Sequence, residues 1–264
     1  MFKKSFIICS MLLSISFLVG CGKGKTSITL AGSTAFQPFA EKLAEQYMSK
    51  NNNISITVQG GGSAVGIQSA NSGAAQIGMA DLVVLPEEAK TLTATVVAKD
   101  GIAIVVNPQN KVENLTTDQI RDIFNGKIKN WSEVGGDSAP ITIVSREAGS
   151  GTRSSFEQII GSVQLKSDAL IQDSNGTIRE TVANDANAVG YLSHGLINEK
   201  IKALKVDDKV CESETIIAGN YKLVRPIFLL VKGELQGDVK NFIDYILSEE
   251  GQSTIKSNGL LPAK

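Results

Sequence analysis

Apolar and polar residues recur along this chain in the order of a short strand, a glycine-rich turn and an amphipathic helix. Ser27–Ala31 alternates as a first strand, and apolar residues within 36–47 then follow at the three-and-four spacing of a helix face. The order returns with a strand over Ile54–Val58 and a helix from Ser63, and a third strand, Ala75–Asp81, ends in a carboxylate. This alternation predicts an open α/β fold.

The rest of the chain repeats the alternation with a second set of strands. Gly101–Val106 is a continuous apolar run, typical of a strand buried on both faces. A helix follows, in which Thr116 and Gln119 have capping-box spacing. Pro226 implies that its strand is an edge or a crossing between lobes. The other predicted elements are strands at 141–144, 189–192, 203–206 and 221–231, and a last helix over 239–247 that Gly251 ends.

Three of the strand-to-helix turns are rich in glycine and hydroxyl residues, namely 32–35, 60–63 and 145–153. A helix N-terminus offers unpaired N–H groups and a partial positive charge, and glycine lets an anion approach the backbone. Arg146 adds a guanidinium that can bind a tetrahedral oxyanion through two nitrogens. Since ligands of open α/β sheets bind beyond the carboxyl ends of the strands, the turns together predict a small anionic ligand. Ordinary helix capping explains each turn taken alone.

The composition argues against several classes of function. The chain has 26 Lys and Arg against 27 Asp and Glu, and 5% aromatic residues, so a nucleic-acid partner is not expected. His194 is the only imidazole, and there is no G-x-S-x-G motif and no cysteine pair at metal-ligand spacing. We therefore expect no catalytic set, no metal and no cofactor, and binding is favoured over catalysis.

The first twenty residues read as a signal peptide rather than as part of the fold. Lys3 and Lys4 precede a mostly apolar segment over 6–19. The sequence Leu18-Val19-Gly20-Cys21 that ends it resembles the bacterial lipobox. This predicts lipidation of Cys21 and a short tether over 21–26, with an uncleaved anchor or an ordinary cleavage site as the alternatives. Because Cys211 is then the only other cysteine of the mature chain, no disulfide is expected.

A known family carries the same loops in the same order. The loops are Gly32-Ser33-Thr34-Ala35, Gly62-Ser63 with Gly66, Ile77–Asp81, Leu115–Gly136 and Arg146–Thr152. In order and spacing they resemble those of the phosphate-binding proteins of bacterial ABC-type phosphate importers, over nearly the whole mature chain.

The resemblance implies a two-lobed, type II periplasmic-binding-protein fold with the ligand cleft between the lobes and a two-segment hinge. The expected lobes are 27–107 with 221–264, and 108–220. The resemblance also implies phosphate import through a membrane permease, and a monomer is expected. Lipidation of Cys21 without a detectable retention signal indicates an anchor at the outer face of the cytoplasmic membrane, with an outer-membrane location as the alternative. The residues it assigns to the ligand are Ser33, Thr34, Ala35, Ser63, Asp81, Arg146, Ser150, Gly151 and Thr152.

Two positions depart from the family pattern. Ala148 stands where some members have an aspartate that accompanies the loop arginine, which leaves Glu147 to orient Arg146. Ala35 stands where some members have an aromatic residue, which leaves only a backbone donor there.

The resemblance gives the carboxylate of Asp81 a physical role in choosing between anions. Phosphate keeps a proton near neutral pH and can donate it to a carboxylate, whereas sulfate cannot and would face a repelling acid. Alternatives stay open at this point: a receptor for sulfate, molybdate or tungstate, a surface phosphohydrolase, or a lipidated adhesin or sensor with the same fold.

Overall fold

The structure, a computed structural model, describes residues 25–263. The predicted signal peptide and Cys21 lie outside the described residues. The strands are β1 Thr26–Gly32, β2 Ile54–Gln59, β3 Ile77–Asp81, β4 Leu92–Val106, β5 Asn114–Leu115, β6 Thr142–Arg146, β7 Leu170–Gln172, β8 Ala188–Ser193, β9 Lys202–Ala203, β10 Lys205–Val206, β11 Val224–Lys232 and β12 Leu261–Pro262.

The α-helices are α1 Gln37–Lys50, α2 Ser63–Ser72, α3 Thr117–Phe124, α4 Gly151–Ile160, α5 Asn175–Asn184, α6 Ser213–Ile217, α7 Gly237–Leu247 and α8 Glu249–Ser257. Three short 3-10 helices complete the structure: η1 Glu87–Ala89, η2 Trp131–Val134 and η3 His194–Leu196. No helix within 25–263 combines the length and the apolar character needed to cross a bilayer.

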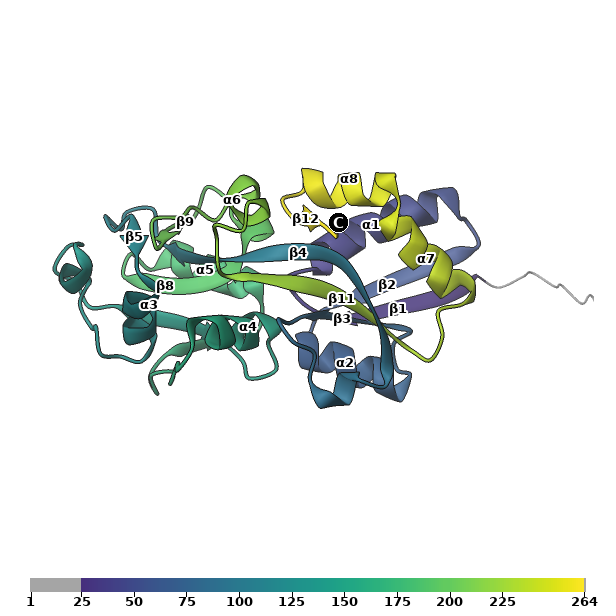
Figure 1. Cartoon of the computed structure of the whole chain (residues 1–264), viewed down its shortest axis with the longest axis horizontal. Coiled ribbons are helices and arrows are strands. Elements are labelled where there is room, and N and C mark those ends of the chain that lie inside the picture. Colours follow the sequence, from purple (N-terminus) through teal and green to yellow (C-terminus); the bar gives the residue numbers. More distant parts are fainter. Residues whose placement is uncertain (1–24, 264) are drawn as a thin grey trace, which may run out of the picture.

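One curled sheet runs through the molecule in the strand order β2-β1-β3-β11-β4-β8-β6-β7. β4 joins its two halves, because Leu92–Gly101 pairs with β11 whereas Ile102–Val106 pairs with β8. Figure 1 shows β4 crossing from one half of the molecule into the other, with helices gathered around each half of the sheet. The chain therefore has the expected two-lobed α/β fold.

The first lobe has helices on both faces of its sheet. One apolar cluster joins α1, α7 and α8 to one face through residues such as Leu43, Phe242 and Ile255. A smaller cluster joins α2 to the other face through Ile67 and Ala70. β1, β2 and β3 are parallel, so their carboxyl ends meet at one edge of the sheet. The turns that carry Ser33, Ser63 and Asp81 lie at this edge.

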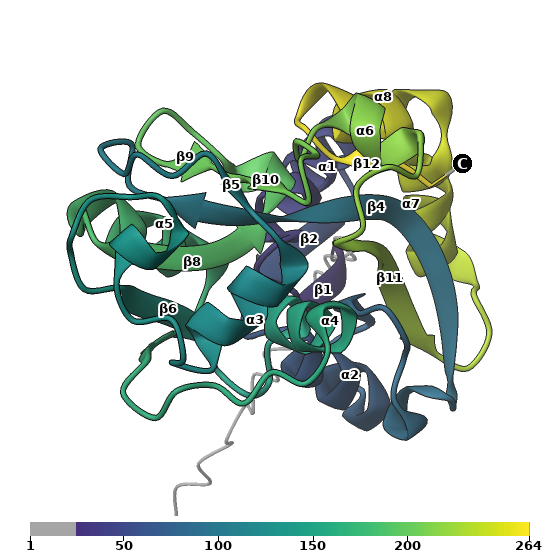
Figure 2. The same cartoon turned by 60° about the vertical axis from the view of Figure 1, so that its left-hand side comes forward.

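The second lobe has its own apolar core. This core contains Phe124, Trp131, Phe156 and Tyr191, and the rings of Phe156 and Tyr191 stack with their centroids 4.1 Å apart. The segment Ile102–Val106, which the sequence analysis assigned to the first lobe, also packs in this core. The carboxyl end of β6 faces back toward the first lobe, and α4 begins there (Figure 2).

Several predicted elements differ from those observed. β4 begins at Leu92, nine residues before the apolar run that predicted it. Gly251 does not end the last predicted helix: α7 ends at Leu247, and Gly251 lies in α8, where a Cβ would come 2.3 Å from the carbonyl oxygen of Tyr245. The predicted strand 203–206 is two short strands, because β9 pairs with β4 and β10 with β5.

The edge alternative for Pro226 is wrong, since β11 lies between β3 and β4. Pro226 is tolerated there because the pairing with β3 begins only at Ile227, so that one side of the proline has no ladder partner in β3.

Candidate anion-binding site

The turn after β1 places Ser33 and Thr34 at the edge of the first lobe. Gly32 has a φ of 132°, and a Cβ there would come 2.2 Å from the carbonyl oxygen of Met79, so the turn requires glycine. Ser33 is buried, and its Oγ accepts hydrogen bonds from the amides of Ala35 at 3.2 Å and Phe36 at 3.1 Å. The Ala35 N–H that the sequence analysis offered to the ligand is therefore directed at Ser33. Ser33 closes this turn rather than capping α1, whose N-cap is Phe36.

The first residue of α2, Ser63, is bonded to the end of β3. Its Oγ donates to Asp81 Oδ1 at 2.7 Å and accepts from the Asp81 amide at 3.1 Å. The preceding Gly62 has a φ of 86°, and its amide donates to the carbonyl of Gly32 at 2.9 Å. The three turns of the first lobe are thus held together by their own hydrogen bonds.

Asp81 is a buried carboxylate, with 2% of its surface exposed. Besides Ser63, it accepts from Thr152 Oγ1 at 3.3 Å, and its Oδ2 lies 2.6 Å from Nη1 of Arg225. Partners of this kind offset the cost of burying a charged group. Asp81 therefore has a cation beside it that the sequence analysis did not anticipate.

The segment between β6 and α4 supplies the cationic side of the site. Arg146 is the last residue of β6 and is 1% exposed. Its Nε donates to Glu147 Oε2 at 2.8 Å and its Nη2 donates to Glu147 Oε1 at 2.8 Å. The predicted role of Glu147 in orienting Arg146 is therefore confirmed. Within residues 25–263, Nη1 of Arg146 is the one buried side-chain polar atom without a hydrogen-bond partner. A buried guanidinium N–H without a protein partner can donate a charge-assisted hydrogen bond to an anion.

The first turn of α4 lies directly against the first lobe. Ser150 is the N-cap, and its Oγ accepts from the Arg153 amide at 3.2 Å. Gly151 is so close to the first lobe that a Cβ on it would be 2.1 Å from Ser63 Oγ and 2.6 Å from the main-chain oxygen of Asp81. Because α2 and α4 both begin here, the free amides and positive dipole ends of two helices converge on the residues around Asp81.

Hydrogen bonds join the two lobes around the site. The amide of Ala64 donates to the carbonyl of Gly149 at 3.1 Å. Asn175 Nδ2, from the start of α5, donates to Thr34 Oγ1 at 3.1 Å and to Thr152 Oγ1 at 3.4 Å. The structure thus has the lobes drawn together around the predicted residues.

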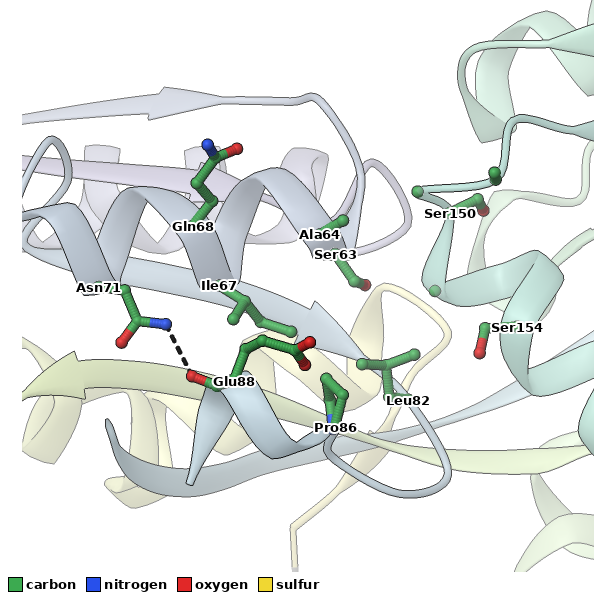
Figure 3. A pocket seen from close by; sticks show the side chains of 13 residues that line it. Ser63, Ala64, Ile67, Gln68, Asn71, Leu82, Pro86, Glu88, Ser150 and Ser154 are labelled. Atoms are coloured by element: carbon green, nitrogen blue, oxygen red, sulfur yellow. Dashed lines mark hydrogen bonds between the residues drawn. The ribbon is translucent and has the colours of Figure 1, made fainter. Parts of the chain in front are cut away.

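A cavity of about 460 Å³ adjoins this region between the lobes. Figure 3 shows Ser63 and Ile67 of α2 on one side of it and Ser150 and Ser154 of the second lobe on the other. Leu82 and Pro86 are among its apolar lining residues, and Asn71, also in the lining, donates to the carbonyl of Glu88 at 2.7 Å.

Four buried polar residues around the site were not predicted as part of it: Asp100, Asn175, Ser193 and Arg225. The sequence did carry a signal for two of them, because Asp100 adjoins an apolar run and Arg225 lies within another. A lone charge beside or within such a run needs a buried partner.

Two further titratable residues have structural partners. His194 lies in η3, partly buried, with Nδ1 2.8 Å from the carbonyl oxygen of Gly259. Burial raises the pKa of Tyr191 to about 12, which keeps its hydroxyl neutral beside Ser145. Among residues 25–263 there is no group of three His, Cys, Asp or Glu side chains arranged to hold a metal ion.

Comparison with known proteins assigns the chain to a family. The family profile described as PBP superfamily domain matches residues 20–250. The phosphate-binding protein PstS of Bacillus subtilis is 36% identical over 245 residues, which cover 91% of this chain and 82% of that protein. PstS of Borreliella burgdorferi is 27% identical, with 99% of each chain covered.

Solved structures agree with this assignment. A Clostridium perfringens substrate-binding protein assigned to phosphate ABC transport, solved with bound phosphate, is 39% identical with a TM-score of 0.87, covering 90% of this chain and all of the other. An ABC-type phosphate transport receptor from Vibrio cholerae is 36% identical with a TM-score of 0.74, covering 89% and 99%. The chain belongs to the PstS family of phosphate-binding proteins, within the PBP superfamily.

Proposed function

We propose that this protein binds inorganic phosphate outside the cytoplasm and delivers it to the membrane permease of an ABC-type importer. The observation that supports this most directly is Arg146, a buried arginine whose Nη1 lacks a partner at the start of α4. The bound phosphate of the C. perfringens relative and the PstS relatives support the choice of anion.

The proposed ligand contacts are those expected from the sequence, with two differences in role. Thr34, Ser63, Asp81, Arg146, Ser150, Gly151 and Thr152 surround the site and are proposed to contact phosphate. Ser33 is instead proposed to shape its turn, because its Oγ already accepts two amides, one of them from Ala35. Ala35 would contact phosphate only if its N–H turned away from Ser33.

Asp81 is proposed to select phosphate over sulfate. Its carboxylate can accept the proton that phosphate retains near neutral pH, whereas sulfate brings no proton and only repulsion. The pairing with Arg225 softens that repulsion but leaves the carboxylate an acceptor and not a donor.

We propose a mechanism in which the two lobes close on the ligand, since a ligand that contacts both lobes stabilises the closed state. The two hinge crossings would lie near Gly101 in β4 and near Val224 in β11, where these strands pass from the core of one lobe to the core of the other. This places the crossings a few residues from the boundaries 107 and 221 expected from sequence.

The membrane attachment rests on the sequence pattern alone. We propose that Cys21 carries the lipid and that the protein is a monomer at the outer face of the cytoplasmic membrane. Mass spectrometry of the protein and of Cys21→Ser tests the lipid, because the mass of the lipid should be lost in the variant.

Calorimetric titration of anion-free protein with phosphate and then sulfate tests the function. One-to-one binding of phosphate with no heat from sulfate is expected. Equal binding of the two would overturn phosphate as the ligand, and no binding of either would refute an anion receptor. A chromogenic phosphoester in the same preparation should remain intact, since we propose binding rather than turnover.

A further inference from the structure

Arg225 and Asp100 form a buried ion pair behind the anion-binding residues. Both side chains are fully buried. Nη2 of Arg225 lies 2.8 Å from Asp100 Oδ2, and its Nε lies 3.3 Å from the same oxygen. The third nitrogen, Nη1, is 2.6 Å from Asp81 Oδ2 and 3.4 Å from the main-chain oxygen of Asp81. One guanidinium therefore bridges the hinge strand β4 and the selecting carboxylate.

The other oxygen of Asp100 is held from the second lobe. Ser193 Oγ, at the end of β8, donates to Asp100 Oδ1 at 2.8 Å, and the Ser193 amide donates to Asn175 Oδ1 at 3.0 Å. Asn175 in turn donates to Thr152 Oγ1, which donates to Asp81. The contacts make a closed ring that starts and ends at Asp81 and passes through both lobes and the hinge.

The ring matters because a carboxylate in a dry site keeps its charge only beside a counter-charge. Here two buried carboxylates share one guanidinium, and burial raises the pKa of Asp100. The planar fork of arginine can serve both acids at once, whereas the single ammonium of lysine cannot reach both in this geometry. Without this guanidinium, Asp81 would lose the partner that holds its Oδ2, and the site would lose a fixed acceptor for the proton of phosphate.

We infer that Arg225, anchored by Asp100, is a positioning residue that holds the Asp81 carboxylate in place as a hydrogen-bond acceptor, and that it thereby sets the preference for a tetrahedral anion that carries a proton. This inference rests on the proposed function. Arg225 acts through Asp81, without a contact to the ligand of its own.

The test compares full-length wild-type protein in detergent with Arg225→Gln, Arg225→Lys, Asp81→Asn and the double variant Arg225→Gln/Asp81→Asn. Phosphate affinity is measured by calorimetry, and sulfate affinity by competition. Arg225→Gln should lower the phosphate-to-sulfate affinity ratio by about tenfold or more. Arg225→Lys should lower it less, by several-fold, as a partial rescue. In the Asp81→Asn background, Arg225→Gln should change the ratio little, because the group it acts on is gone.

A purely structural role for Arg225 would weaken both anions together and leave the ratio unchanged. A wild-type ratio in folded Arg225→Gln would therefore overturn the inference. If Arg225→Gln does not fold, Arg225→Lys provides the test. A several-fold fall in its phosphate-to-sulfate affinity ratio would support the inference, and a wild-type ratio would contradict it. Additive losses in the double variant would also overturn it. Wild-type protein that binds neither anion would instead refute the proposed function, and this role with it.

Discussion

Gly151 and Ser63, from different lobes, lie so close that a Cβ on Gly151 would be 2.1 Å from Ser63 Oγ. The serine hydroxyl could rotate away, but the same Cβ would also be 2.6 Å from the main-chain oxygen of Asp81, which cannot. The contact therefore requires glycine at the first residue of α4.

Gly151→Ala should accordingly oppose closure. Forcing a methyl group into a packed contact costs about 1–3 kcal/mol, which corresponds to a roughly five- to 150-fold loss of phosphate affinity. Gly149→Ala is the matched control, because its Cβ would meet only Ala64 Cβ, at 3.4 Å. Calorimetry on both variants checks this; equal affinities would mean that the lobes bind phosphate without approaching this closely.

Asp81→Asn should weaken the discrimination between phosphate and sulfate more than it weakens the binding of phosphate. The amide keeps the size of the side chain but can offer a donor to sulfate, so the phosphate-to-sulfate affinity ratio should fall by about tenfold or more. Asp137→Asn, in an exposed pair with Lys111, serves as the control. An unchanged ratio in Asp81→Asn would remove the selecting role of this carboxylate.

Arg146→Lys should weaken phosphate and sulfate alike. A lysine cannot hold both oxygens of Glu147 and also present a separate donor, so we expect a loss of about 2–5 kcal/mol for either anion. The ratio of the two affinities should stay near the wild-type value, which distinguishes this variant from Asp81→Asn. Arg179→Lys, at a surface pair, should bind phosphate normally; affinity retained in Arg146→Lys would make Arg146 peripheral.

Asp207→Asn should destabilise the fold at neutral pH but not in acid. Hydrogen bonds from the amide and hydroxyl of Thr117, together with Lys222, lower the pKa of Asp207 below its ordinary 3.8. A lowered pKa stabilises the folded state above pH 3.8 and loses that contribution as pH falls through the folded pKa. We expect a deficit of about 1 kcal/mol at pH 7.

Asparagine suits this test because Asp207 has a φ of 49°, a conformation that asparagine tolerates. The measurement is the free energy of unfolding in urea at pH 7 and near pH 3. A deficit as large in acid as at pH 7 would show that geometry, not charge, is responsible.

The glycine- and hydroxyl-rich turns at the starts of the helices could be predicted because local chemistry specifies them. The capping box at Thr116 and Gln119 is present, and Ser150 caps α4 as its hydroxyl and position suggested. The glycines, the hydroxyl residues and the strand before each turn are neighbours in the chain. A single sequence is therefore enough to show them.

What the sequence did not reveal is pairing over long distances. Asp81, Asp100 and Arg225 are brought together only by the insertion of β11 between β3 and β4. No local pattern encodes which strand neighbours which. The start of β4 and the end of α7 were missed for a related reason, since strand partners and the following helix α8, not the apolar period, set these two boundaries.

The place of β11 also sets an order of assembly. Every principal strand of the second lobe lies between residues 102 and 193, so that lobe can pair its strands as soon as this stretch is available. The first lobe has to leave its sheet open between β3 and β4 until Val224–Lys232 arrives, near the end of the chain. A chain that emerges from its N-terminus therefore completes last the lobe that it began first. Shortening it before Lys232 should cost the first lobe its central strand rather than a dispensable tail.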